Sequence, residues 1–174
     1  MKYLFLEAKI KLEKVELSKK DIMKLPKNIG LVTTIQFIDH LKDFKAILEK
    51  NNKKCFIGKD IQKYSGQILG CEFSSAIKVN DKVDAILYIG SGKFHPIGLA
   101  IQTGKKVFCY NPSLKIFSEV DYKYVEKVKK RRKGALVKFY SSKNIGILVS
   151  AKPGQQNLKQ AMKLKEKLKK ENKE

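Results

Sequence analysis

The sequence predicts an α/β fold, a parallel sheet with helices on both of its faces. Short apolar runs alternate along the chain with stretches that have helical spacing, an order typical of βαβ units. Residues 84–90, DAILYIG, are almost continuously apolar, as expected of a strand that is buried on both sides of a parallel sheet. Several predicted strands also end in loops rich in small or polar residues.

The first part of the chain is predicted to contain peripheral strands, a core strand and a long helix. Residues 1–20 partly alternate apolar and charged side chains, which indicates a strand or two. A β-rich run covers residues 29–33, and the hydroxyls of Thr33 and Thr34 suit the cap of a following helix. That helix is indicated by apolar residues at helical spacing, namely Phe37, Leu41, Phe44, Ile47 and Leu48. Residues 54–58, KCFIG, form the next strand.

The middle of the chain continues the alternation. Residues 66–71, GQILGC, are predicted as a third short strand and residues 74–80, SSAIKVN, as a brief helix or turn. Residues 95–104, HPIGLAIQTG, have the proline near the start and the glycine at the end that are typical of a helix. Residues 105–112, KKVFCYNP, form another strand.

The last part of the chain is rich in lysine. Residues 119–136 are predicted as a strongly basic helix. From Lys143 the strand-then-loop pattern starts again, and residues 158–174 form a terminal helix. One complete domain is therefore followed by the first strand and helix of another α/β unit.

The net charge of +21 is compatible with nucleic-acid binding. Arg131 and Arg132 are, however, the only arginines among 38 basic residues. Lysine presents a point charge rather than the fork with which arginine reads bases. Because the lysines are also spread along the chain, nucleic-acid binding is possible but not favoured.

Nothing in the sequence indicates a membrane protein. No apolar run reaches the roughly 18 residues of a transmembrane helix, and the first residues lack the features of a signal peptide. We therefore expect a cytoplasmic protein.

The chain has three cysteines, and none lies in a C-x-x-C pair. A disulfide framework and a zinc site are therefore not expected. Cys55 and Cys109 lie in short apolar runs and are predicted to be buried structural thiols. Cys71 follows Gly70 at the end of a predicted strand, where a loop should begin.

The most distinctive loop is GSGKFHP, residues 90–96. Its glycines allow close approach of a ligand, and the following helix N-terminus favours a carboxylate or phosphate. It fits neither the Walker pattern nor G-x-G-x-x-G, so an ordinary turn remains an alternative. His95 could act as an acid or base, whereas His40 lies in an amphipathic helix and is expected to be structural.

Cys71 admits more than one chemistry. A Cys71–His95 nucleophilic pair lacks any hydrolase signature around either residue. A lone cysteine at a strand end could instead supply one ligand of an iron–sulfur cluster, with other cysteines coming from elsewhere.

Four segments, in this order and spacing, resemble the diphthamide biosynthesis enzymes, the archaeal and eukaryotic 2-(3-amino-3-carboxypropyl)histidine synthases. They are GLVTTIQF, GQILGC, DAILYIGSGKFHPIGLAIQTGKKVFCYNP and IGILVSAKPGQQNLKQAMKLKEKL. The resemblance runs from about residue 2 to 170, and L-G-C together with G-S-G-K-F-H-P is its specific part.

The resemblance implies a function. Members of the family bind a [4Fe–4S] cluster through three cysteines, one from each of three similar α/β domains. The reduced cluster cleaves S-adenosylmethionine, and the resulting 3-amino-3-carboxypropyl radical adds to a histidine of translation elongation factor 2. Cys71 matches the central-domain cluster cysteine. The residues that match loops around the cluster and S-adenosylmethionine are Thr33, Thr34, Gln36, Gly90, Ser91, Gly92, His95, Gly154 and Gln155.

The resemblance also divides the chain. Residues 1–28 match the tail of an N-terminal domain, residues 29–142 the central domain, and residues 143–174 the truncated start of a third unit. The cysteines of the first and third domains have no counterpart in the sequence. The chain is therefore expected to work with a partner chain that supplies them, or as a homodimer. The alternative is a non-catalytic or basic module, derived from this family, that binds RNA or a translation factor.

Overall fold

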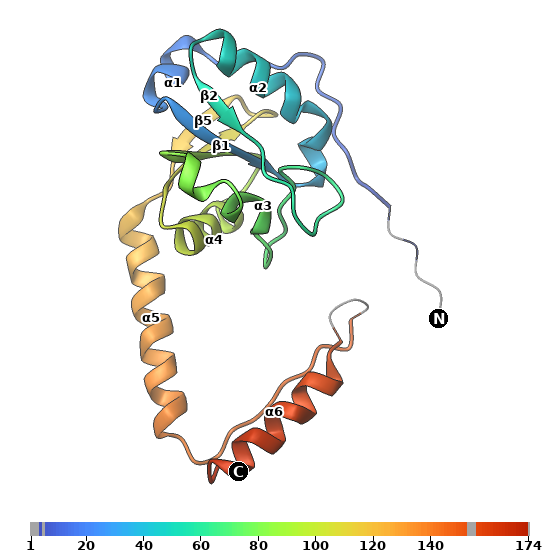
Figure 1. The fold of residues 1–174 in the computed structure, drawn as a ribbon, viewed down its shortest axis with the longest axis vertical. Coiled ribbons are helices and arrows are strands. Elements are labelled where there is room, and N and C mark those ends of the chain that lie inside the picture. The colour runs from blue at the N-terminus through green and yellow to red at the C-terminus, as the bar shows by residue number, and fades with distance from the viewer. Residues whose placement is uncertain (1–3, 5, 153–155, 174) are drawn as a thin grey trace. The chain divides into compact units, whose positions relative to one another are not determined.

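The computed structural model describes residue 4, residues 6–152 and residues 156–173. Its centre is a five-stranded sheet of order β2-β1-β3-β4-β5 (Figure 1). The first four strands are parallel, and β5 runs antiparallel to β4. The strands are β1 (Asn28–Thr33), β2 (Lys54–Phe56), β3 (Ala85–Ile89), β4 (Lys106–Asn111) and β5 (Ile116–Glu119).

Helices connect the parallel strands, as the sequence predicts. The chain forms α1 (Lys19–Lys24), the 3-10 helix η1 (Ile35–His40), α2 (Leu41–Lys50), α3 (Ser74–Ile77), the 3-10 helix η2 (Asn80–Lys82), α4 (Phe94–Thr103), α5 (Tyr122–Ser141) and α6 (Leu158–Lys170). Helix α4 ends, as predicted, at Gly104, whose φ of 67° is left-handed and whose N–H bonds to the carbonyl of Ala100.

The core has two layers, one on each face of the sheet. Leu31 faces a cluster with Phe44 of α2, whereas the next residue, Val32, faces a cluster with Leu99 of α4. All five residues of β3 are buried, which confirms the prediction of a strand covered on both sides. Helices α1 and α2 lie on one face and α3 and α4 on the other (Figure 1). The predicted three-layer α/β fold is confirmed.

The strands expected within residues 1–20 are wrong for the described part of that range. Ser18 begins α1 instead, because its Oγ accepts a hydrogen bond from the N–H of Asp21 (3.1 Å). The preceding residues are held by isolated contacts, such as the bond from the N–H of Ile10 to the carbonyl of Gln36 (2.8 Å).

Two further strands were predicted and do not form, and one was missed. In GQILGC only isolated bridges occur, at Gln67 and Leu69, because a tight turn at residues 70–71 ends the segment. Residues 143–150 have no assigned strand, since no described strand lies beside them. Strand β5 was missed because its pairing with β4 depends on the intervening turn rather than on an apolar run.

The chain divides into two compact units, Leu6–Val125 and the residues from Glu126 onward. The division lies inside α5, earlier than the predicted boundary at residue 142, because Val125 is the last α5 residue in the core of the sheet unit. Residues 6–28 belong to the same unit as the sheet. Among the described residues, no helix is long and apolar enough to cross a membrane.

Candidate functional site

The strand order creates a switch point at the carboxyl ends of the parallel strands. From β1 the chain crosses to β2 on one side, whereas β3 pairs on the other side of β1. In open parallel sheets of this order, ligands bind outside the carboxyl ends of the strands at such a switch point. Here that point lies between Thr33, at the end of β1, and Ile89, at the end of β3, which are register partners.

Thr33 joins the two strand ends. Its side chain is fully buried, and its hydroxyl donates a hydrogen bond to the carbonyl of Ile89 (2.6 Å). The next residue, Thr34, has a buried hydroxyl that makes no close hydrogen bond among the described residues, although it lies near enough to the Tyr88 hydroxyl to lower the pKa of that tyrosine slightly against the effect of burial. Gln36 is exposed, and its carbonyl accepts from the N–H of Ile10. Thr34 therefore retains donor capacity at the switch point, whereas Thr33 already uses its own within the sheet.

The loop after β3 requires its glycines. Gly90 has a φ of 156°, and a Cβ there would lie 2.5 Å from the hydroxyl oxygen of Tyr88. The Tyr88 hydroxyl donates a hydrogen bond to the carbonyl of Ser91 (3.2 Å). Gly92 has a φ of 77° and no atom within 4 Å of its Cβ position, so its backbone faces open space. The loop is thus fixed at Ser91 and open at Gly92.

His95 lies in the first turn of α4 above the same tyrosine. Its ring stacks on that of Tyr88, with centroids 5.8 Å apart and an interplanar angle of 16°. Burial lowers the pKa of His95, which favours the neutral imidazole. The N-cap residue, Lys93, makes no side-chain cap hydrogen bond, so the helix N-terminus presents amide donors without that side-chain partner.

Cys71 lies at the tip of a tight turn. Leu69 and Glu72 exchange both backbone hydrogen bonds (2.9 and 3.2 Å) and leave Gly70 and Cys71 as the two turn residues. A Cβ on Gly70 would lie 2.6 Å from Cε1 of Phe94. The structure therefore brings the Cys71 turn against the residue that precedes His95, at the same edge of the sheet.

Sequence reasoning missed Glu72, which anchors this turn. Its carboxylate accepts a hydrogen bond from the N–H of Ser74, the first residue of α3. Burial by itself raises the pKa of Glu72, but hydrogen bonding to Ser74 and Gln62 outweighs burial, and the net pKa is lowered. A carboxylate two residues before Ser74, at the start of a short predicted helix, was a signal that could have found Glu72.

Comparison with known proteins identifies the family. The profile described as "Putative diphthamide synthesis protein" matches residues 1–174. The chain belongs to this family. It is 40% identical over 156 residues to the 2-(3-amino-3-carboxypropyl)histidine synthase of Pyrococcus horikoshii, covering 88% of this chain and 44% of that protein. It is 31% identical to subunit 1 of the Schizosaccharomyces pombe synthase, covering 99% of this chain and 40% of that subunit.

A solved structure agrees. The crystal structure of Dph2 from Pyrococcus horikoshii with a 4Fe-4S cluster has a TM-score of 0.77 and 39% identity, and the match covers 89% of this chain and 45% of that one. This diphthamide-family chain thus spans less than half the length of these relatives.

The thiols of this family member differ sharply in accessibility. Cys71 is exposed, Cys55 is buried and Cys109 is partly buried. Burial raises the pKa of both Cys55 and Cys109 to about 12, which disfavours the thiolate that binds metal. Within the described residues no group of three or more His, Cys, Asp or Glu gathers as a metal site. The described thiols therefore fit one ligand position of an iron–sulfur cluster and not a complete set.

Two of the predicted site residues, Gly154 and Gln155, lie outside the described residues. Their role stays a prediction. The remaining predicted residues lie at the end of β1, on the segments that follow β1 and β3, or on the neighbouring Cys71 turn.

Proposed function

We propose that this chain is a component of a diphthamide synthase that transfers a 3-amino-3-carboxypropyl group from S-adenosylmethionine to a histidine of translation elongation factor 2, in the cytoplasm. Cys71 would be one thiolate ligand of a [4Fe–4S] cluster. The observation that carries the proposal is the packing of the exposed Cys71 turn against Phe94, at the end of the glycine loop of the switch point.

The residues at this edge have distinct roles in the proposal. The open backbone at Gly90, Ser91 and Gly92, together with the N-terminus of α4, would bind the carboxylate of S-adenosylmethionine. Neutral His95 and the Thr34 hydroxyl would donate or accept hydrogen bonds without bringing a charge.

The remaining predicted residues have other roles. Gln36 would contact the ligand at the switch point, and buried Thr33 would hold the two strand ends in place rather than touch the ligand. Gly154 and Gln155 lie outside the described residues and stay predicted ligand-binding residues. When bound, the cluster supplies the electron that cleaves the bond between sulfur and Cγ of S-adenosylmethionine. Residues 143–174 would begin a further α/β domain, whereas residues 6–28 belong to the sheet unit.

The other cluster ligands would come from a partner chain or, in a homodimer, from a second copy. Of the described thiols only Cys71 is exposed, so a second copy would add one further exposed thiol. Some relatives are named as one subunit of the synthase, which supports a partner chain that carries the other cysteines.

Anaerobic iron–sulfur reconstitution tests the proposal. The chain alone should show little of the visible absorbance of a [4Fe–4S] cluster, whereas a partner that carries further cysteines should restore it. Cys71→Ala should abolish the gain, and Cys109→Ala, the matched control, should preserve it. A cluster that forms equally well with Cys71→Ala would overturn the assignment.

The charge distribution supports a second candidate function, that of a basic module that binds RNA. Helix α5 exposes five basic residues, Lys127, Lys130 and residues 131–133. Among the described residues, the ion pair within this helix joins Lys129 to Glu126 and leaves these five without one. This candidate predicts RNA binding with a steep salt dependence that collapses when residues 127–133 are neutralised. Binding that is insensitive to salt would exclude it.

A further inference from the structure

Tyr88 is the buried residue on which the loop after β3 rests. It lies in β3, its side chain is 1% exposed, and it belongs to the core cluster on the α4 face of the sheet. Its hydroxyl nevertheless reaches the loop, because its oxygen lies 2.5 Å from the place where a Cβ of Gly90 would be. Glycine at position 90 therefore makes room for the tyrosine.

The hydroxyl of Tyr88 stays a hydrogen-bond donor near neutral pH. Burial, and after it the nearby Cys109, raise the pKa of Tyr88 to about 12, whereas the Thr34 hydroxyl lowers it. The proton is therefore retained, and it is donated to the carbonyl of Ser91 (3.2 Å). The phenolic oxygen can still accept from a donor such as Thr34.

The contact with Ser91 sets the direction of the next amide. The described chain has no cis peptide bond, and in a trans peptide the C=O and the following N–H point in opposite directions. Because the Ser91 carbonyl is directed inward to Tyr88, the N–H of Gly92 is directed outward. No atom lies within 4 Å of a Cβ position at Gly92, and its N–H donates to no backbone acceptor among the described residues. The Gly92 N–H is therefore an available donor with a fixed direction.

The residues after Gly92 continue the same donor surface. Gly92 has a φ of 77° and Lys93 a φ of −100°. Opposite signs of φ at successive residues are typical of backbone nests, in which N–H groups converge on an anion. The first N–H groups of α4 follow directly and have no acceptor within the helix. The ring of His95 stacks on that of Tyr88, so one tyrosine supports both the loop and the imidazole.

We propose that Tyr88 is a positioning residue for the 3-amino-3-carboxypropyl end of S-adenosylmethionine, because its hydroxyl holds the Ser91 carbonyl inward and thereby directs the Gly92 N–H to the carboxylate. This inference rests on the proposed function, which places that carboxylate at residues 90–92 and the N-terminus of α4. Tyr88 acts through the loop, since its own side chain is buried. Its loss should therefore affect the carboxylate end of the ligand and not the adenosine end.

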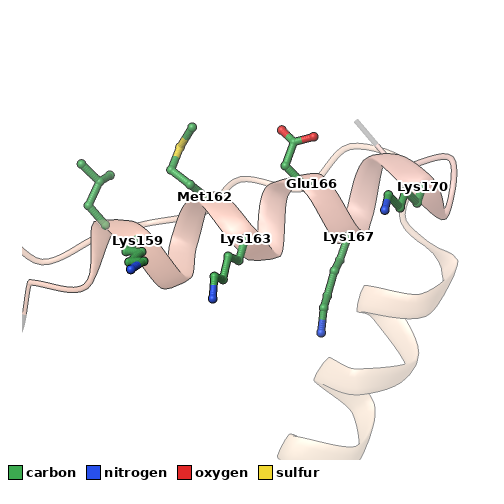
Figure 2. Close-up of a pocket in the computed structure, with 7 residues that line it drawn as sticks. Lys159, Met162, Lys163, Glu166, Lys167 and Lys170 are labelled. Atoms are coloured by element: carbon green, nitrogen blue, oxygen red, sulfur yellow. The ribbon is translucent and has the colours of Figure 1, made fainter.

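The lysines of α6, which lies in the other compact unit, are a second group that could attract a carboxylate. Lys163 and Lys167 project from one side of this helix, whereas Met162 and Glu166 project from the other (Figure 2). Each lysine is a point charge on a flexible stem. These lysines offer attraction by charge without donors of fixed direction, and Lys163→Gln serves as a control for such binding.

NMR relaxation of the ligand-free chain tests the loop. The Gly92 N–H should have the order parameter of rigid backbone in the wild type, about 0.85, and should fall below about 0.6 in Tyr88→Phe. Tyr122→Phe is the matched control, because the Tyr122 hydroxyl also donates to a backbone carbonyl, that of Lys105, before the start of β4. This control should leave Gly92 unchanged. A Gly92 value that is already low in the wild type, or that is unaltered in Tyr88→Phe, would overturn the proposal.

Calorimetry with two probes tests the link to the ligand. Tyr88→Phe should weaken the binding of S-adenosylmethionine about fivefold or more, as expected for the loss of one hydrogen bond. It should leave the binding of 5′-methylthioadenosine unchanged, because this probe lacks the 3-amino-3-carboxypropyl group. Tyr122→Phe and Lys163→Gln should bind both probes like the wild type. Equal weakening of both probes by Tyr88→Phe would indicate a general structural effect and would overturn the proposal.

Failure of this inference and failure of the proposed function give different results. If the wild-type chain, alone or with the partner used for cluster reconstitution, binds no S-adenosylmethionine, the proposed function fails together with the role of Tyr88 in binding. If the wild type binds S-adenosylmethionine and Tyr88→Phe binds it equally tightly, the inference about Tyr88 fails and the proposed function stands.

Discussion

Gly70 lies directly against the ring of Phe94, where a Cβ would be 2.6 Å from Cε1. Gly70 has no positive φ, so its turn does not require glycine for conformational reasons. What the position requires is space for the ring. The contact joins the Cys71 turn to the loop that precedes α4, two segments that are distant in the sequence.

A double-mutant cycle should measure this contact. Gly70→Ala is expected to cost about 1 kcal/mol of unfolding free energy, because the added methyl group must displace the ring. Phe94→Ala removes the ring, so Gly70→Ala should cost little in that background, with a coupling of about 0.5 kcal/mol or more. Chemical denaturation of the four proteins gives the values. Additive effects would show that the two segments do not touch in solution.

The three thiols should react at very different rates. In the native chain at pH 8, iodoacetamide should alkylate Cys71, which is exposed. Cys55 and Cys109 should resist, because burial raises the pKa of each to about 12 and blocks access. Mass spectrometry should find one modified site in the native chain and three after unfolding in guanidinium. Rapid native labelling of Cys55 or Cys109 would contradict the structure.

The elements that sequence reasoning placed well are those with a strong local signal. Strand β3 and helix α4 were predicted because a continuous apolar run and the proline and glycine at the helix ends act over a few residues. The position of Gly90, between the carboxyl end of β3 and the start of α4, follows from these two elements. In contrast, the segments at 66–71 and 143–150 were predicted as strands from apolar character alone, and pairing decides whether a strand forms.

The parts of the site that sequence reasoning missed depend on long-range contacts. The approach of Phe94 to Gly70 arises from the packing of α4 beside the Cys71 turn, and no spacing rule links these residues. The stacking of His95 on Tyr88 likewise requires the glycine loop between them to fold back. Thr33 was assigned to the ligand site through the family resemblance, and the sequence could not show that its buried hydroxyl donates a hydrogen bond to the carbonyl of Ile89.

His95 should make the fold more sensitive to acid. Burial lowers its pKa from the ordinary value of 6.5, so the unfolded chain binds the proton more readily than the folded chain. Stability from this residue is therefore present above pH 6.5 and is lost as the pH falls through the folded-state pKa. His95→Gln should lose less stability than the wild type between about pH 6.5 and pH 5 in urea titrations. An NMR titration midpoint for His95 at or above 6.5 would contradict the burial.

Residues 7–10 form a strap that is held at Glu7 by the loop after β2 and at Ile10 by Gln36. The carboxylate of Glu7 accepts hydrogen bonds from Lys63 (2.7 Å) and from the hydroxyl of Tyr64 (2.8 Å). These hydrogen bonds, with Lys63 first, lower the pKa of Glu7, so the carboxylate stays ionised near neutral pH. Three residues later, the N–H of Ile10 bonds to the carbonyl of Gln36. The strap thus connects the loop after β2 to a predicted ligand-binding residue.

Glu7→Gln should loosen the strap without unfolding the sheet. The neutral amide cannot hold Lys63 by charge, so the Ile10 amide should exchange with deuterium several-fold faster, while the amides of β3 keep their protection. High salt should have the same effect on the wild type, because these groups are exposed and therefore screened. Glu13→Gln is the matched control, since Glu13 is exposed and has no ion pair among the described residues. If the Ile10 amide exchanges at the same rate in Glu7→Gln and Glu13→Gln, the Glu7 contacts do not hold the strap in place.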